Sequence, residues 1–326
     1  MVNKVLITGG AGFIGGNFIH LITRKYPNYK IYNLDSLTYA GELEKHKVLE
    51  KNENYKFVKG DITDKNFVFN LFKEEQFNYI VHFAAESHVD RSIDNPEIFV
   101  KTNVLGTQNL LDASRCIKID KFIHVSTDEV YGELPMDPTE FFTEETELKP
   151  NSPYSASKAA SDLLVRSYYQ TFGLPINITR CSNNYGPFHF PEKLIPLTIS
   201  RVINDLKIPI YGDGRNIRDW LHVVDHCRAI DLVLHKGVDG EVYNIGGHNE
   251  QSNLDVVKTI IKSLNSSEEL IDFVKDRLGH DKRYAIDPSK IKKLGWEPVY
   301  SFEEGISETI EWYLNNKSWW TPLLTR

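Results

Sequence analysis

Cysteine is scarce in this chain, and long hydrophobic runs are missing. Cys116, Cys181 and Cys227 are the three cysteines in 326 residues, and they lie far apart without the paired spacing of metal ligands. This pattern argues against a disulfide framework and against a structural zinc site. No apolar run approaches the ~18 residues of a membrane span. An apolar strand begins almost at once, so we expect no signal peptide and a protein of the reducing cytoplasm.

An excess of positive charge is also missing. The chain has 38 basic and 45 acidic residues, which gives a formal net charge of -7. A general nucleic-acid surface needs a basic face, so we expect no nucleic-acid partner and no membrane partner. An anionic small ligand remains compatible with this balance, because a local basic pocket can exist in an acidic protein. The length and the 41% hydrophobic composition predict about two domains with a large core.

Short apolar runs alternate with helical patterns through the first half of the chain. Strands are predicted near 5–7, 31–34, 57–58, 79–83, 122–125 and 176–178, with helices between several of them, notably over 96–113 and 154–169. Continuous apolar strands are typical of a parallel sheet that is covered on both faces. The alternation therefore predicts an α/β fold with a doubly wound parallel sheet of the Rossmann type.

The second half of the chain has a different pattern. Pro187, Pro191 and Pro196 interrupt it soon after the sixth predicted strand, and helix and loop patterns follow. We predict a dinucleotide-binding domain over 1–185 and a smaller mixed α/β substrate domain over 186–326. A helix is predicted over 224–235. A strand is predicted over 241–245, and the glycine pair 246–247 ends that strand. We expect the stretch 219–247 to pack back on the first sheet, so that the two domains are partly interleaved.

A glycine pattern directly follows the first strand and opens a helix. Glycines at 9, 12 and 15 allow a sharp turn and a close approach of the backbone to a pyrophosphate, which the helix N-terminus favours. Asp35 ends the second strand twenty residues after Gly15 and can bind the ribose hydroxyls, and it would repel a 2′-phosphate. We therefore predict that this site binds NAD and not NADP. The alternative is that residues 9–15 form only a tight turn and bind no ligand. Asp61 and Ile62 either flank the adenine or mark an ordinary helix cap.

Two further groups of residues carry chemistry. Tyr154 and Lys158 share one helix face, where a cationic lysine favours the phenolate and lets the tyrosine act as a base. Thr127, Asp128 and Glu129 follow the fifth strand, at the sheet edge that faces a ligand. Adjacent carboxyls raise the pKa of one member and can thus form an acid and base pair. The alternatives are an exposed helix face and a solvated loop.

These motifs together resemble a known family. The glycine turn and the Tyr154-x-x-x-Lys158 pattern are similar to the extended short-chain dehydrogenase/reductases. More narrowly, the resemblance is to the dTDP-glucose 4,6-dehydratases and extends from residue 5 to about residue 320. It is carried by Thr127-Asp128-Glu129-Val130-Tyr131-Gly132 and by the segments 84–92, 183–187 and 276–284.

The resemblance implies an internal redox elimination on dTDP-glucose that gives dTDP-4-keto-6-deoxyglucose. Tyr154 takes the proton of the 4-hydroxyl while hydride leaves carbon 4 for NAD, and Thr127 binds the same oxygen. Glu129 then removes the proton of carbon 5, and protonated Asp128 gives its proton to the departing 6-hydroxyl. Hydride finally returns to carbon 6. The cofactor ends as it began, in a pathway of deoxysugar biosynthesis of the dTDP-rhamnose type.

The resemblance also implies two binding sets. The cofactor set is Gly9, Gly12, Phe13, Ile14, Gly15, Asp35, Ser36, Thr38, Asp61, Ile62, Phe83, Ala84, Ala85, Thr102, Tyr154, Lys158 and Asn184. The substrate set is Ser87, His88, Thr127, Asn183, Lys193, Pro209, Tyr211, Arg218, Asn253, Arg277, His280 and Tyr284. Within it, Arg218 and Arg277 are the first choices for the diphosphate, and Tyr284 is expected to close the pocket.

Three other interpretations stay open at this point. The helices over 96–113 and 154–169 resemble the family's dimer-forming helices, which implies a homodimer, but their apolar faces could equally be core. A 4-epimerase, or a dehydratase for another nucleotide sugar, is the nearest alternative function. An epimerase needs the Tyr/Lys pair but not the carboxyls at 128 and 129. A dinucleotide-binding regulator without catalytic activity would need neither the Tyr/Lys pair nor the carboxyls at 128 and 129.

Overall fold

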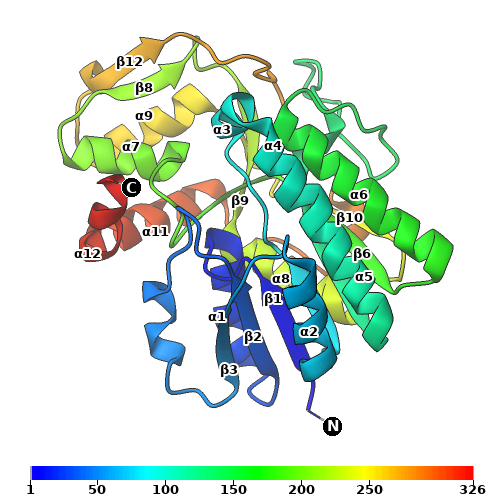
Figure 1. The fold of residues 1–326 in the computed structure, drawn as a ribbon. Coiled ribbons are helices and arrows are strands. Elements are labelled where there is room, and N and C mark those ends of the chain that lie inside the picture. The colour runs from blue at the N-terminus through cyan, green and yellow to red at the C-terminus, as the bar shows by residue number, and fades with distance from the viewer. Residues whose placement is uncertain (1, 326) are drawn as a thin grey trace.

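The computed structural model describes residues 2–325, and its centre is one seven-stranded parallel sheet (Figure 1). The strand order is β10-β6-β5-β4-β1-β2-β3. The strands are β1 Lys4–Thr8, β2 Lys30–Asp35, β3 Tyr55–Lys59, β4 Tyr79–His82, β5 Lys121–Thr127, β6 Ile176–Cys181 and β10 Val242–Ile245. The order reverses between β1 and β4, and ligands bind outside the strand ends at such a point. The predicted doubly wound sheet is confirmed.

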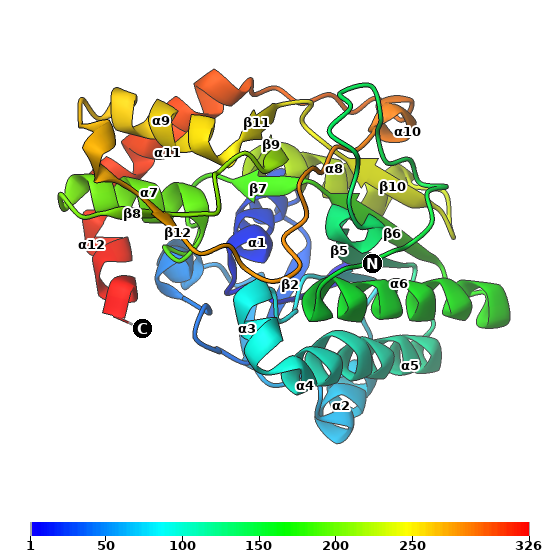
Figure 2. The ribbon, with the colours of Figure 1, turned by 90° about the horizontal axis from the view of Figure 1, so that it is seen from above.

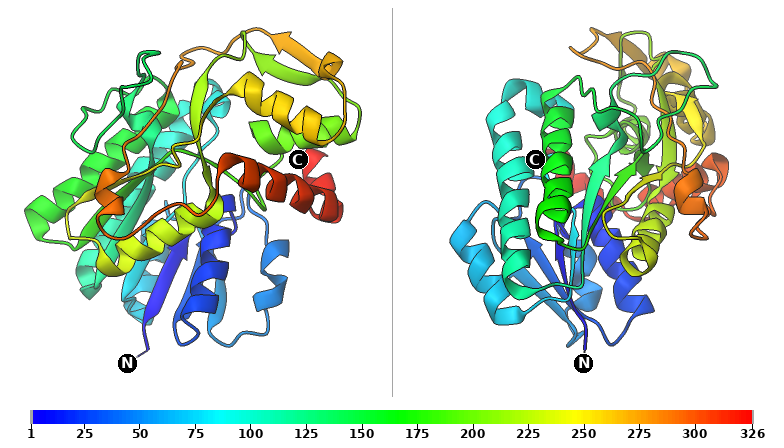
Figure 3. Two further views of the ribbon diagram at one scale, coloured as in Figure 1. Left: turned by 180° about the vertical axis from the view of Figure 1, so that it is seen from behind. Right: turned by 90° about the vertical axis from the view of Figure 1, so that its right-hand side faces the viewer.

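Helices cover both faces of this sheet (Figures 2 and 3). One face carries α1 (Phe13–Lys25) and α8 (Val223–Lys236), and the other carries α2 (Lys65–Glu75), α5 (Thr107–Ile117) and α6 (Pro153–Phe172). Side chains alternate along β1, so Val5 and Ile7 pack with α1 and α8 while Leu6 packs toward α2 and α5. Burial on both faces explains why these strands are continuous apolar runs.

A smaller mixed region lies beyond the carboxyl ends of the strands (Figure 1). It contains the sheet β11-β9-β7 and the pair β12-β8. Its elements are β7 Asn183–Tyr185, α7 Leu194–Ile203, β8 Ile208–Tyr211, β9 Ile217–His222, β11 Glu250–Ser252, α9 Asn253–Ser263, β12 Ile271–Val274, α11 Phe302–Asn315 and α12 Lys317–Trp320. The short helix α10 (Ser289–Lys292) packs instead against β10 and the core of the large sheet. Between α7 and β11, the chain returns to the large sheet, because β10 pairs in parallel with β6.

The helix expected over 96–113 is not one regular helix. It consists of α4 (Pro96–Phe99), a wider π-helical segment (Val100–Gly106) and α5, and it follows the short helix α3 (Val89–Asp94). The widened segment carries Asn103, whose amide bonds to both the N–H and the carbonyl of Glu86 and to the hydroxyl of Ser157. These contacts with the loop after β4 and with α6 explain why the segment departs from a regular α-helix. Such π-helical widening frequently occurs at functional sites.

Two short 3₁₀ segments complete the walls around the strand ends. One, η1, spans Glu44–Leu49 after β2, and the other, η3, spans Asp128–Tyr131 directly after β5. No helix within residues 2–325 has the length and apolar character needed to cross a membrane.

Candidate active site

The glycine turn lies where β1 and β4 separate. Gly9 has a φ of +71°, and a Cβ there would lie 2.6 Å from the backbone nitrogen of Ala84. A Cβ on Gly15 would lie 2.5 Å from the carbonyl oxygen of Gly9. Both positions therefore require glycine, and α1 starts at Phe13 without a side-chain cap on its first amides. A narrow backbone cradle with uncapped amides fits a dinucleotide pyrophosphate.

Asp35 lies beside this turn at the end of β2. Its Oδ2 accepts from the N–H of Ala11 at 3.0 Å and its Oδ1 accepts from the N–H of Leu37 at 2.8 Å. Burial raises the pKa of the Asp35 carboxyl, and these backbone donors oppose the rise. Each oxygen keeps a further lone pair for a ribose hydroxyl. Asp35 thus connects the turn to the place where the prediction puts the adenosine ribose.

A single large cavity runs from the glycine turn to the smaller region. Its volume is about 810 Å³. Every predicted cofactor residue lines it, as does every predicted substrate residue except Tyr284. The alternative role for Asp61, a helix cap, is wrong, because Asp64 caps α2 by accepting from the N–H of Phe67. Asp61 instead accepts from the N–H of Thr63 at the cavity wall.

Tyr154 and Lys158 are positioned by the start of α6. Ser152 forms a reciprocal capping box with Ser155, and Pro153 occupies the first helical position, so the helix begins at a defined residue. Tyr154 and Lys158 are both buried, and the Lys158 Nζ donates to the carbonyl of Val125 at 2.8 Å. This bond joins α6 to the end of β5.

The predicted lowering of the tyrosine pKa by Lys158 is wrong for this structure. Burial, followed by the charge of Glu129, raises the pKa of the Tyr154 phenol well above its ordinary value, and a hydrogen bond with Thr127 opposes that rise. Burial also lowers the pKa of Lys158 to about 8. The lysine is directed at a backbone carbonyl, and desolvation outweighs the attraction that sequence spacing predicts.

Asp128 and Glu129 begin η3, which Thr127 caps by accepting from the N–H of Glu129 at 3.3 Å. Asp128 is 2% exposed, and its Oδ2 has no hydrogen-bond partner among the described residues. Burial raises the pKa of Asp128 well above its ordinary value, and Glu129 and Asp219 add to the rise. This shift favours the protonated form of Asp128.

Glu129 lies in a more positive environment than its neighbour. Burial raises its pKa, but Arg277, Arg218 and Lys193 oppose the rise. The two adjacent carboxyls therefore differ, with the stronger shift on Asp128. This separation is the arrangement that supports one acid and one base.

The predicted phosphate-binding cations surround the far end of the cavity. Arg218 in β9 donates to the carbonyls of Ile217 and Asp281 and lies 4.3 Å from the ring centre of Tyr284. Arg277 lies 3.9 Å from a carboxylate oxygen of Asp90. Burial lowers the pKa of Lys193, whose Nζ donates to the carbonyl of Ser87 at 3.3 Å. These cations make the local basic pocket that an acidic chain can still contain.

Tyr284 does not close the pocket. It is 3% exposed, lies beneath the Arg218 guanidinium and donates to the carboxylate of Asp281. It therefore supports Arg218 from behind. His280 lines the cavity and bonds through Nδ1 to Asp276 at 2.6 Å. The Tyr211 hydroxyl donates to Asp90 at 3.3 Å at the same mouth of the cavity.

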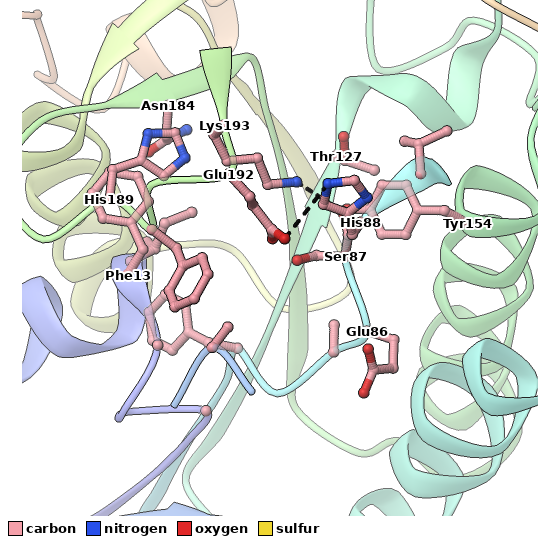
Figure 4. A pocket seen from close by; sticks show the side chains of 18 of the residues that line it. Phe13, Glu86, Ser87, His88, Thr127, Tyr154, Asn184, His189, Glu192 and Lys193 are labelled. Atoms are coloured by element: carbon pink, nitrogen blue, oxygen red, sulfur yellow. Dashed lines mark hydrogen bonds and ion pairs between the residues drawn. The ribbon is translucent and has the colours of Figure 1, made fainter. Parts of the chain in front are cut away.

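The sequence analysis missed a group of residues around Glu192. Glu192 accepts from the Tyr39 hydroxyl at 2.9 Å, and its other oxygen lies 3.6 Å from His88 Nε2 and 4.0 Å from Arg91. Figure 4 shows Glu192 and Lys193 reaching across the cavity toward His88, beside Thr127 and Tyr154. The neighbouring prolines, at 187 and 191, marked this segment only as a loop.

Aromatic rings form the other wall. Phe13 stacks on His189 with ring centres 4.2 Å apart, and both lie on the opposite side of the cavity from Tyr154 (Figure 4). Asn184 Oδ1 accepts from His226 Nδ1 at 2.8 Å, and its Nδ2 donates to the carbonyl of Ser182. Ser36, Thr38 and Thr102 line the cavity near the cofactor turn, and Asn183, Pro209 and Asn253 line it toward the smaller region. Among residues 2–325 no cluster of three metal-ligating side chains occurs.

Comparisons with known proteins agree with this geometry. The family model described as GDP-mannose 4,6 dehydratase matches residues 6–309. A dTDP-glucose 4,6-dehydratase of Escherichia coli is 52% identical over 98% of this chain and 96% of its own length. The crystal structure of dTDP-glucose 4,6-dehydratase from Bacillus anthracis in complex with NAD has a TM-score of 0.91 and 51% identity, covering 98% of this chain and 99% of that one.

A second solved structure is similar over the same extent. DesIV, a dTDP-glucose 4,6-dehydratase from Streptomyces venezuelae with NAD and TYD bound, has a TM-score of 0.94 and 46% identity, covering 98% of this chain and 99% of that one. Identity near one half over almost the whole chain, together with the fold and the cavity, establishes the relationship. The chain belongs to the family of nucleotide-sugar 4,6-dehydratases described by that model, and within it to the dTDP-glucose 4,6-dehydratases.

Proposed function

We propose that this chain is an NAD-dependent lyase that dehydrates dTDP-glucose to dTDP-4-keto-6-deoxyglucose. The observation that carries the proposal is the pair Asp128 and Glu129, whose pKa values are shifted to different extents beside Tyr154 in one cavity. An oxidoreductase that only exchanges hydride, or an epimerase, has no use for a buried proton donor next to a second carboxyl. A dehydratase needs both.

The residues around the glycine turn would hold NAD. Gly9, Gly12 and Gly15 leave room for the pyrophosphate at the start of α1, and Asp35 is placed for the ribose hydroxyls. Bound NAD supplies a positively charged ring that accepts hydride from carbon 4, favours the Tyr154 phenolate, and gives the hydride back at carbon 6. Lys158, anchored on the carbonyl of Val125, lines the same cavity and would bind the nicotinamide ribose.

Tyr154 and Thr127 act on the 4-hydroxyl of the sugar. The Tyr154 phenolate takes the hydroxyl proton, and the Thr127 hydroxyl orients the same oxygen by a hydrogen bond. Thr127 ends β5 and Tyr154 lies in the first turn of α6, and both line the same cavity. Both side chains are buried in the cavity wall, so bound substrate and cofactor would shield them from water.

Asp128 and Glu129 carry out the elimination. The ketone at carbon 4 acidifies the proton on carbon 5, and the Glu129 carboxylate removes it. Asp128, which burial keeps protonated, gives its proton to the departing 6-hydroxyl, which leaves as water. Glu129 then returns its proton to carbon 5. Over the cycle Tyr154 gains one proton and Asp128 loses one, so transfer of a proton from Tyr154 to Asp128 through solvent restores the enzyme, and the substrate has lost one water.

Cations at the far end of the cavity bind the diphosphate. Arg218 and Arg277 are placed for its charges, with Lys193 and His280 next to them. Guanidinium groups suit phosphate because they donate in a fixed fork. We assign 1–185 to the NAD-binding domain and 186–326 to the nucleotide-sugar domain, with about 219–247 packing back on the first sheet. The separate sheets β11-β9-β7 and β12-β8 support a second domain, and β7 (Asn183–Tyr185) joins it from the end of the first range.

The proposal also covers the assembly and setting of the enzyme. The protein would act as a homodimer in the cytoplasm, in deoxysugar biosynthesis of the dTDP-rhamnose type. Apolar side chains remain exposed along α4 to α6, namely Ile98, Val100, Leu105, Leu163 and Phe172. Packing these helices against a second copy would cover them. Cys116, Cys181 and Cys227 are free thiols, as expected in a reducing compartment.

Incubation with dTDP-, UDP-, CDP- and GDP-hexoses without added cofactor tests the proposal. The keto-sugar product is followed by its alkaline absorbance and identified by mass. Loss of one water from dTDP-glucose alone is the expected result. Interconversion without a mass change would indicate an epimerase, and stoichiometric release of reduced cofactor would contradict the internal redox cycle.

A further inference from the structure

A lysine and a histidine that no step above uses lie beneath the glycine turn. Lys45 is 6% exposed and His46 is 2% exposed, and both come from η1. Charged and titratable side chains are rarely buried this completely without specific partners. Their partners are therefore informative about what the buried groups do.

Both side chains donate to the backbone of the glycine turn. His46 Nε2 donates to the carbonyl of Gly10 at 2.8 Å. Lys45 Nζ donates to the carbonyl of Ala11 at 3.0 Å and to that of Gly12 at 2.7 Å. Burial lowers the pKa of His46 to about 4, so the ring is neutral and carries its proton on the nitrogen that faces Gly10. Three consecutive carbonyls of the turn are thus bound from one side.

These bonds decide which way the turn presents its N–H groups. In a planar trans peptide the carbonyl and the following N–H point in opposite directions. The bond from Lys45 to the Gly12 carbonyl therefore directs the N–H of Phe13 away from η1. Phe13 is the first residue of α1, and no side chain caps that end of the helix. An uncapped first-turn amide is the group that receives a phosphate oxygen.

The surroundings of Lys45 hold it in this position. A Cβ on Gly16 would lie 2.7 Å from Lys45 Cδ, so the lysine crosses α1 only because residue 16 is glycine. Its Nζ lies 5.7 Å from the ring centre of Phe188 and 5.9 Å from that of Trp319. Cations are attracted to such ring faces. Trp319 lies in α12, so the C-terminal part of the chain reaches the cofactor turn.

We propose that Lys45 and His46 are positioning residues that fix the glycine turn for the pyrophosphate of NAD, and that Phe188 and Trp319 keep Lys45 in place. The inference rests on the proposed function only in that NAD is the ligand. A cofactor that is regenerated in each cycle gains from being retained. Burial lowers the pKa of Lys45 to about 7, and its amine donates to the turn in either protonation state. A turn whose carbonyls are already bound in this way receives the pyrophosphate without first being ordered.

The test compares Lys45→Met with Lys47→Met. Methionine keeps the length of Lys45 but removes its charge and donors. Lys47 lies two residues further along η1, is exposed and pairs with Glu44 at the surface, so it is the matched control. We expect Lys45→Met to purify with little NAD and the apoprotein to bind NAD about tenfold to a hundredfold more weakly by titration calorimetry. At saturating NAD its kcat should stay within about twofold of the wild-type value, which separates positioning from catalysis.

A second pair of variants keeps the test decisive if Lys45→Met does not fold. His46→Leu removes the donor to Gly10, whereas His46→Gln keeps an N–H at nearly the same place and should restore NAD affinity. Unchanged NAD affinity in both Lys45→Met and His46→Leu would overturn the inference. A wild-type protein that binds NAD but leaves dTDP-glucose unchanged would instead overturn the proposed function alone.

Discussion

Replacing Asp128 by asparagine should separate oxidation of the sugar from loss of water. The side chain is 2% exposed, and its Oδ2 is without a hydrogen-bond partner among the described residues. Burial and the neighbouring Glu129 raise its pKa, which favours the protonated form that can give its proton to a leaving hydroxyl. Asparagine has the same shape and still donates a hydrogen bond, but it cannot give up a proton.

The expected loss of dehydration rate follows from the role of Asp128 as the general acid. Positioned general acids contribute ~10²–10⁴-fold, so dehydration should slow by that factor, which is about 2.7–5.4 kcal/mol of barrier. Oxidation at carbon 4 depends on Tyr154 and Thr127 and should change by less than about tenfold. Single-turnover mixing with dTDP-glucose, followed by the absorbance of reduced nicotinamide, should therefore show the reduced form accumulating in Asp128→Asn but not in the wild type.

Stability provides the control for this experiment. Because its pKa is raised, Asp128 keeps its proton in the folded protein at pH values where the unfolded chain, above about pH 4, has released it. The wild-type free energy of unfolding therefore falls as pH rises from about 4 to the raised pKa of folded Asp128. Asp128→Asn should thus be more stable than the wild type at neutral pH, with the difference vanishing below about pH 4. Asp272→Asn, which changes an exposed carboxyl of β12, should alter neither measurement. Dehydration within tenfold of the wild-type rate in folded, ligand-binding Asp128→Asn would refute the reasoning.

Three further predictions follow from the same site. Tyr154→Phe should slow oxidation itself by ~10²–10⁴-fold, so mixing with dTDP-glucose should give no reduced-nicotinamide signal. The wild-type rate of dehydration should rise with pH through the raised pKa of Glu129 and fall as pH passes that of Asp128, and Asp128→Asn should lose the alkaline fall. Gly15→Ala should purify without NAD, because the new Cβ would lie 2.5 Å from the Gly9 carbonyl oxygen, and adding NAD should not raise its melting temperature.

The large sheet could be predicted from the sequence because its strands are local features. Each strand is a short apolar run, and burial on both faces makes that run continuous, as in β1 and β5. The π-helical segment around Asn103 could not be predicted from the sequence. It depends on contacts with Glu86 and Ser157, which are remote in sequence.

The candidate cavity was predicted residue by residue only where a family motif fell on it. Glu192 and Lys45 were missed because a lone charged residue in a polar stretch is indistinguishable from a solvated one until its partners are known. Lys45 lies between Glu44 and Lys47, in a pattern typical of an exposed helix face. Tyr284 was placed wrongly for a related reason: the sequence puts it near the site, but only the structure shows that Arg218 lies between it and the cavity.

The different roles of Asp128 and Glu129 are set by residues far from them in the sequence. Two adjacent carboxyls on a short 3₁₀ turn are nearly equivalent in sequence. Asp219, in β9, adds to the raised pKa of Asp128, while Arg277 and Lys193, from two separate loops, oppose the rise for Glu129. The same cations are the proposed ligands of the diphosphate. The charges proposed to anchor the substrate therefore also oppose the rise in the Glu129 pKa, so substrate binding and the difference between the two carboxyls depend on the same cations.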